Sequence, residues 1–209
     1  MHVLGVVPAP GDDWILDPRV DVGALLLGAA CLLDEVSDGP VLVVVGPGRP
    51  LAGSALSGAT VAVDVAELPG DEVRVRAALT AAELVVVHDP RCPGVPPAFL
   101  RDLVARAVAG QAAVGVRPVV DTLKATVGGV VTATVDRESL RMVCSPLVVA
   151  GALLADVADL PGRLGDLGRL VTALREHGPL ELVVAPEAAR RAEDPSALAL
   201  LALQRERPH

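Results

Sequence analysis

The feature that most constrains the fold is a series of short apolar runs, rich in β-branched residues, that each stop at Gly, Pro or Asp. The runs do not alternate apolar with polar residues, so each suits a strand buried on both faces, as in a mostly parallel sheet. They cover residues 3–11, 41–48, 60–65, 83–90, 112–120 and 180–186. Because the chain has one Trp, one Phe and no Tyr, its core must be built from Val, Leu and Ala.

Segments with apolar residues at helical spacing separate most of these runs. They cover residues 21–36, 71–82, 96–110, 163–177 and 187–206. This alternation predicts a three-layer α/β/α fold with a mostly parallel sheet and right-handed crossovers. No internal repeat, linker or low-complexity segment interrupts the pattern, so we expect a single domain over residues 1–209.

One segment, residues 122–140, breaks the alternation. Its apolar residues alternate with polar ones around Gly128-Gly129, which predicts a β-hairpin with a Gly-Gly turn. A hairpin that projects from an α/β body often serves as a dimerisation arm, here over about residues 120–142. A hairpin folded against its own domain fits the pattern equally well.

Composition excludes several classes of protein. The net charge of −8 and the pI of about 4.9 argue against a nucleic-acid binder. The three cysteines are far apart and form no CxxC pair, which fits a reduced compartment and gives no zinc pattern. The longest apolar stretch is about a dozen residues, too short to span a bilayer. With no basic leader at the N-terminus, we expect a cytoplasmic protein that does not associate with membranes.

Three segments carry a recognisable series: "VVVHDPRCP" at 85–93, "PVVDTLK" at 118–124 and "TVDRESLRMVCSPLVV" at 134–149. In order and spacing this series resembles the 2-C-methyl-D-erythritol 4-phosphate cytidylyltransferase family. The N-terminal "GVVPAPG" at 5–11 is similar to the start of the family's nucleotide loop, and "VVAPEAA" at 183–189 is similar in place to a C-terminal family segment.

The resemblance implies an α/β nucleotidyltransferase fold and a homodimer whose arms cross. It also implies a magnesium-dependent reaction of the isoprenoid precursor pathway, in which a polyol phosphate attacks the α-phosphate of CTP and releases diphosphate. Such chemistry depends on positioning and on neutralising charge around the phosphates.

Asp89 ends the run at 83–90 and matches the aspartate that binds metal in the family. A carboxylate at the carboxyl end of a strand suits Mg²⁺, and ligands of parallel α/β sheets bind at that edge. The other interpretation is an aspartate that caps a loop. His88 points to the opposite side of the strand, so we expect a packed or solvent-facing histidine and not a base.

The nucleotide loop departs from the family's pattern. Where the family has glycines followed by an Arg and a Lys that neutralise the triphosphate, this chain has Asp12 and Asp13, which place negative charge there. Pro10 also removes one backbone donor. The residues that match the loop, and that the resemblance implies for nucleotide binding, are Pro8, Ala9, Pro10 and Gly11.

Four arm residues match the family's substrate motifs. Thr122 and Arg137 match residues that hold the substrate phosphate from the neighbouring subunit, and Asp121 and Lys124 complete the first arm motif. Arginine suits phosphate because its planar guanidinium donates two parallel hydrogen bonds. A solvated hairpin is the alternative interpretation of all four.

Several other family positions are changed. The family's Arg after His-Asp-Ala-Ala is Cys92, with Arg91 shifted by one place, and the Gln after Thr-Pro is Leu147. A C-terminal lysine of the family corresponds to about Leu182. Lys124 is the only lysine in the chain, so neither of the family's other functional lysines can have moved to another position.

Two hypotheses follow. The first is a divergent cytidylyltransferase that acts on CTP and a polyol phosphate, with Mg²⁺ at Asp89. The second is a non-catalytic relative, a dimer that keeps the fold and serves as a binding or partner protein. Because several charge-stabilising groups are missing, the residues favour impaired or altered catalysis.

Overall fold

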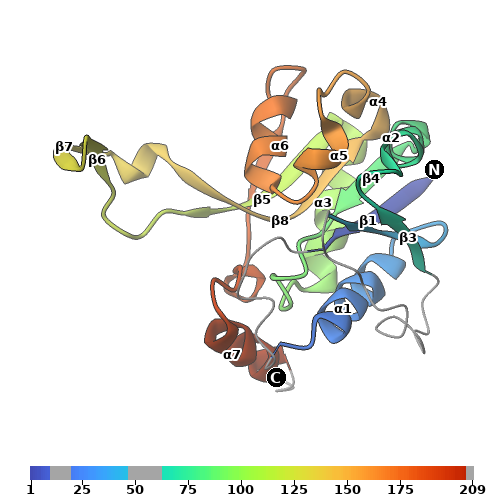
Figure 1. The fold of residues 1–209 in the computed structure, drawn as a ribbon, viewed down its shortest axis with the longest axis horizontal. Coiled ribbons are helices and arrows are strands. Elements are labelled where there is room, and N and C mark those ends of the chain that lie inside the picture. The colour runs from blue at the N-terminus through green and yellow to red at the C-terminus, as the bar shows by residue number, and fades with distance from the viewer. Residues whose placement is uncertain (10–19, 47–62, 206–209) are drawn as a thin grey trace.

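The computed structural model describes residues 1–9, 20–46 and 63–205. Within these ranges a seven-stranded sheet has the order β3-β2-β1-β4-β8-β5-β9 (Figure 1). Its strands are β1 (Val3–Pro8), β2 (Val41–Val45), β3 (Val63–Glu67), β4 (Leu84–Val87), β5 (Ala112–Pro118), β8 (Arg141–Ala150) and β9 (Glu181–Val184). The parallel pairs are β1–β2, β1–β4, β2–β3 and β5–β9, which confirms the mostly parallel sheet predicted from sequence.

Strand β8 was not among the predicted strands, and it runs antiparallel to both β4 and β5. It joins the two parallel parts of the sheet, so the sheet is mixed. Parts of the predicted runs 3–11, 41–48 and 60–65 lie outside the described residues.

Helices cover both faces of the sheet (Figure 1). They are α1 (Val22–Asp34), α2 (Glu72–Ala81), α3 (Pro97–Gly110), α4 (Gly151–Leu154), α5 (Leu160–Arg163), α6 (Leu167–Leu174) and α7 (Pro195–Arg205), with 3₁₀ turns η3 (Arg137–Ser139) and η4 (Glu187–Ala189). Local signals explain some of the helix starts. The Asp21 carboxylate accepts a hydrogen bond from the Ala24 N–H at 2.9 Å, and Pro97 occupies the first turn of α3. No helix in the described part of the chain is long and apolar enough to cross a membrane.

The apolar core lies in two layers, one on each face of the sheet. In β4, Val85 and Val87 belong to the cluster with α2, α4, α5 and α6, whereas Val86 belongs to the cluster with α1 and α3. Each fully buried aliphatic side chain contributes about 1.5–3 kcal/mol relative to exposure. Burial on both faces explains the uninterrupted apolar runs of β1, β2 and β4. The edge strands β3 and β9 are mostly exposed, so the expectation of burial on both faces was wrong for the runs at 60–65 and 180–186.

Two predicted helices differ from those observed. The predicted helix 187–206 begins only at Pro195, and the residues before it form η4 and an irregular stretch that packs against the loop after β4. Proline favours the first turn of a helix, so Pro195 starts α7. The predicted helix 163–177 is broken at Gly165, which separates α5 from α6.

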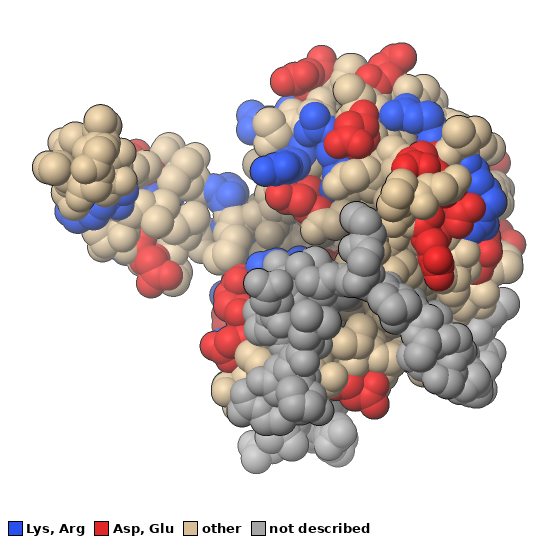
Figure 2. Space-filling model, viewed as in Figure 1, with Lys and Arg blue, Asp and Glu red and all other residues tan. Residues whose placement is uncertain are grey.

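The predicted hairpin is confirmed. Strands β6 (Lys124–Val127) and β7 (Val130–Thr134) pair antiparallel, and they project from the body as an arm (Figure 1). Gly128 and Gly129 have φ values of +58° and +81°, which glycine adopts without steric strain. Figure 2 shows that the surface at the tip of the arm is mostly uncharged. Its exposed apolar residues include Val127, Val130 and Val131.

Candidate active site

The carboxyl ends of three neighbouring strands meet at one edge of the sheet. The His88 N–H donates to the Val6 carbonyl at 2.9 Å, and the Ala9 N–H donates to the Val44 carbonyl at 2.7 Å. These bonds place Asp89, Pro8 and Ala9 at the same edge, where ligands of parallel α/β sheets bind. Pro10 and Gly11, the other two predicted nucleotide-loop residues, lie outside the described residues, as do Asp12 and Asp13.

The carboxylate of Asp89 is held by two arginines. Oδ1 accepts from the Arg91 backbone N–H and from Arg91 Nε, both at 2.9 Å. Oδ2 accepts from Arg91 Nη2 at 2.9 Å and from Arg191 Nε at 3.0 Å. Asp89 is 6% exposed and Arg91 is 4% exposed, so this ion-pair cluster is removed from water. Arg191 also donates from Nη1 to Glu193 Oε2 at 3.0 Å.

Burial and charge act in opposite directions on these groups. Burial raises the pKa of Asp89, and the hydrogen bond from the Arg91 backbone and the charge of Arg191 oppose that increase. Burial also lowers the pKa of Arg91 to about 10, with the nearby Arg191 charge adding to the decrease. Arg91 therefore remains charged at neutral pH.

This arrangement does not fit a magnesium ion bound directly to Asp89. Mg²⁺ needs lone pairs of carboxylate oxygens at short distance, and here both oxygens accept hydrogen bonds from cationic groups. Among the described residues, no group of three or more His, Cys, Asp or Glu side chains is placed to hold a metal ion. Magnesium at Asp89 thus stays a prediction of the family resemblance, and the geometry argues against it.

His88, the residue after β4, is packed in the interior. It is 1% exposed, and its Nδ1 lies 2.6 Å from Ser145 Oγ, which also accepts from the Asp89 N–H at 2.9 Å. Burial lowers the pKa of His88 to about 3, so the ring is neutral at physiological pH. Ser145, which sequence reasoning did not single out, contacts the His88 ring and fixes the backbone of Asp89.

The loop after Asp89 packs against the segment that precedes α7. The Ala192 N–H donates to the Arg91 carbonyl at 2.8 Å, and a Cβ on Gly94 would lie 2.4 Å from the Ala188 carbonyl oxygen. Cys92 is buried in an apolar cluster beneath this contact. Burial raises the pKa of the Cys92 thiol, so the thiol stays protonated.

The four predicted arm residues lie on or beside the projecting arm and are exposed. Lys124 Nζ donates to Thr134 Oγ1 at 2.6 Å, and Arg137 Nη1 donates to the Val120 carbonyl. Within the described part of one chain, the hydrogen-bond partners of Asp89 come from its own loop, β8 and the segment before α7, and not from the arm. The structure therefore does not bring Asp121, Thr122, Lys124 and Arg137 to Asp89 within one chain (Figure 1).

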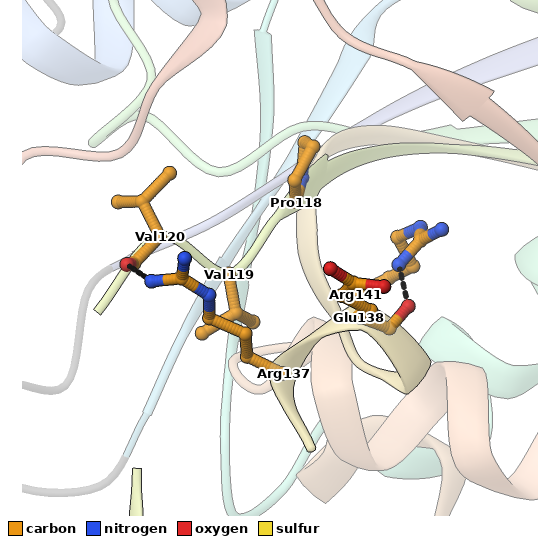
Figure 3. A pocket seen from close by; sticks show the side chains of 6 residues that line it. All are labelled: Pro118, Val119, Val120, Arg137, Glu138 and Arg141. Carbon is orange, nitrogen blue, oxygen red and sulfur yellow. Dashed lines mark hydrogen bonds between the residues drawn. The ribbon is translucent and has the colours of Figure 1, made fainter. Parts of the chain in front are cut away.

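A cavity of about 520 Å³ lies at the base of the arm. Figure 3 shows Arg137 directed to the Val120 carbonyl, whereas Arg141 turns back to the Glu138 carbonyl. The lining residues are Pro118, Val119, Val120, Arg137, Glu138 and Arg141. The two guanidinium groups beside the apolar wall suit a small ligand that carries an anionic group, whereas the Glu138 carboxylate opposes one.

Comparison with known proteins agrees with the order of these motifs. The family model described as IspD: 2-C-methyl-D-erythritol 4-phosphate cytidylyltransferase matches residues 27–164, which include Asp89 and the whole arm. This chain belongs to the IspD family. The resemblance expected from the sequence is thereby confirmed.

Three IspD relatives illustrate the similarity. The 2-C-methyl-D-erythritol 4-phosphate cytidylyltransferase of Bordetella petrii is 35% identical over 87% of this chain and 88% of its own length. The crystal structure of the Thermus thermophilus enzyme of that name has a TM-score of 0.67 and 31% identity, covering 98% of each chain. The Francisella tularensis IspD structure has a TM-score of 0.69 at 18% identity, covers 98% of this chain and 100% of its own, and shows the fold alone.

Proposed function

We propose that this chain is an IspD-type cytidylyltransferase with impaired or altered catalysis. Its ligands are CTP and a polyol phosphate, and 2-C-methyl-D-erythritol 4-phosphate is the substrate named for its relatives. In the reaction, an oxygen of the substrate phosphate forms a bond to the α-phosphorus of CTP. The bond from that phosphorus to the bridging oxygen breaks, and diphosphate leaves.

The observation that carries the proposal is the burial of two altered motif positions. Cys92 and Leu147 stand where the family pattern has Arg and Gln, and they are 1% and 0% exposed. Cys92 packs in an apolar cluster with Val95, and Leu147 lies in the larger core cluster. Leu147 has no hydrogen-bond donor, and the buried thiol of Cys92 is only a weak one. Loss of one comparable donor slows catalysis roughly 10²–10³-fold.

The distribution of positive charge supports the same conclusion. The only lysine of the chain, Lys124, is on the arm and donates to Thr134. Leu182, at about the position of a family lysine, is an exposed apolar residue of the edge strand β9. Apart from Lys124 and a metal ion, charge neutralisation of a triphosphate therefore has to come from arginines, which differ from lysine in shape and reach.

We also propose that the chain acts as a homodimer joined through the arm at 120–142. An isolated two-stranded hairpin is marginally stable in water, and this one exposes several valines. In the dimer, Thr122 and Arg137 of one subunit hold the substrate phosphate at the site of the other. The cavity at the base of the arm, with Arg137 and Arg141 on its lining, is consistent with this role.

A non-catalytic dimer that binds a small ligand or a protein partner is the second candidate function. The hydrogen bonds of Asp89 favour this non-catalytic candidate, because a carboxylate already held by two arginines is poorly placed to take part in phosphoryl chemistry. The fold and the arm would then be kept for binding and assembly.

Calorimetric titration of CTP and of methylerythritol phosphate into the full chain separates the two candidates. The first predicts that both ligands bind and that Arg137→Gln weakens the phosphate ligand roughly 10–100-fold, through loss of charge-assisted hydrogen bonds. Arg101→Gln is the matched control, because Arg101 lies on α3 and pairs with Glu35 at the surface. If neither CTP nor methylerythritol phosphate binds, the second candidate is favoured.

A further inference from the structure

The ion pair between Asp89 and Arg191 joins parts of the chain that are 102 residues apart. Asp89 follows β4, whereas Arg191 lies in the irregular stretch between η4 and α7. Arg91, two residues after Asp89, donates three hydrogen bonds from its side chain to the same carboxylate. One buried anion thus lies between two guanidinium groups from different segments.

Other contacts tie the same two segments together. The Ala192 N–H donates to the Arg91 carbonyl at 2.8 Å, next to the Arg191 ion pair. Gly94 lies so close to the Ala188 carbonyl that a Cβ there would approach to 2.4 Å. Below them, Cys92 and Ala189 share a buried apolar cluster. The Asp89 carboxylate is therefore part of a continuous contact between the two segments.

We propose that Asp89 in this chain is the centre of a buried ion-pair cluster that fastens residues 186–193 to the loop after β4, in place of binding a divalent cation. A metal ion at this carboxylate would have to displace Arg91 or Arg191, or lie within a few ångströms of both positive charges. Displacing Arg91 would leave its buried guanidinium without the Asp89 carboxylate, which is costly, whereas Arg191 is partly exposed and would keep its pair with Glu193. The proposal concerns folding and metal affinity and does not rest on the proposed function.

Thermal unfolding of four full-length proteins tests the cluster: wild type, Asp89→Asn, Arg191→Gln and the double variant. Asp89→Asn keeps the size of the side chain and removes its charge, and breaking a buried pair should lower the Tm by roughly 6–20 °C. Arg191→Gln should lower it less, and the double variant should lose less than the sum of the two. Arg101→Gln, which breaks the exposed pair with Glu35, should change the Tm by about 2 °C or less.

Hydrogen–deuterium exchange of Arg191→Gln keeps the test decisive even if Asp89→Asn does not fold. Exchange in residues 186–193 and in the loop after β4 should rise relative to wild type and to Arg101→Gln. Unchanged exchange in both segments, or additive Tm losses in the double variant, would overturn the proposed cluster.

Electron paramagnetic resonance of added Mn²⁺ tests the exclusion of metal. If Asp89 is committed to the arginines, wild type and Asp89→Asn bind Mn²⁺ with the same affinity. A tenfold or larger loss of Mn²⁺ affinity in Asp89→Asn would show that Asp89 is a metal ligand in the wild-type protein and would contradict the proposal.

Discussion

The Nδ1 atom of His88 lies 2.6 Å from the hydroxyl oxygen of Ser145, and both residues are buried at the junction of β4 and β8. Ser145 Oγ already accepts the Asp89 N–H, so its own proton can be donated to the neutral ring. This junction connects the strand that carries Asp89 with the antiparallel strand beside it.

Acid should destabilise the protein through His88. Its pKa is lowered by burial from 6.5 to about 3, so between these values the unfolded chain binds a proton that the folded chain does not. The free energy of unfolding contributed by His88 should therefore fall by about 2–3 kcal/mol from pH 7 to pH 4.5. Urea unfolding of wild type and His88→Gln at both pH values measures this contribution. It is the difference between the two proteins in how much the free energy of unfolding changes from pH 7 to pH 4.5.

The matched control for the histidine is His177→Gln, because His177 is exposed. The carboxylates contribute equally to the pH dependence of the free energy of unfolding in all three proteins, so their contribution cancels in the comparison. Equal pH dependence of wild type and His88→Gln would mean that His88 is not held neutral.

Ser145→Ala should destabilise the fold by about 2–3 kcal/mol. The substitution removes the acceptor of the Asp89 N–H and the partner of His88, and leaves two buried polar groups without hydrogen bonds. Ser139→Ala serves as the control, because Ser139 donates to the Asp136 carbonyl on the exposed part of the arm. Chemical denaturation should show a change below about 0.5 kcal/mol for that control, and similar losses in the two variants would contradict the role of Ser145.

Gly94→Ala should cost about 1–3 kcal/mol, because its new methyl group would meet the Ala188 carbonyl oxygen at 2.4 Å. Gly110→Ala is the comparison, since a Cβ at the end of α3 meets no atom within 4 Å. Alanine also favours the helix, so that variant should be neutral or slightly stabilised. Both are measured by urea unfolding, and a neutral Gly94→Ala would show that the two segments separate easily.

Much of the fold could be predicted because each of the sequence patterns used has one clear physical cause. Strands buried on both faces need uninterrupted apolar residues, and the turn between β6 and β7 needs φ > 0, which Gly128 and Gly129 provide. Strand β8 was missed because its first residues are exposed and Pro146 interrupts its apolar run. The irregular stretch before Pro195 was missed because its contacts are with distant residues and not with its own helix.

The site was predictable in position and not in its contacts. Asp89 follows a recognisable strand, so its place at the sheet edge could be derived from sequence. Arg191 lies 102 residues further along the chain, in a segment with no periodic signal, and its ion pair with Asp89 depends on how that segment packs. Arg91 stands only two residues after Asp89, and this short spacing was the one indication in the sequence of a local ion pair.

Charge at the tip of the arm should weaken the proposed dimer. Val130→Asp and Val131→Asp place carboxylates on an exposed apolar surface, where the folded monomer tolerates them and a subunit interface does not. Sedimentation velocity should show the dimer dissociation constant rising roughly tenfold or more. Val73→Asp, on the exposed face of α2, should leave it unchanged, and equal dissociation constants in all variants would exclude the arm from the interface.

The most direct test of impaired or altered catalysis is the rate of diphosphate release from CTP and 2-C-methyl-D-erythritol 4-phosphate. This chain and the Bordetella petrii relative should be assayed side by side with Mg²⁺ supplied. Since Cys92 and Leu147 remove two polar groups of the family pattern, we predict a kcat/KM at least roughly 100-fold below that of the relative. Equal kcat/KM values for the two proteins would contradict the account.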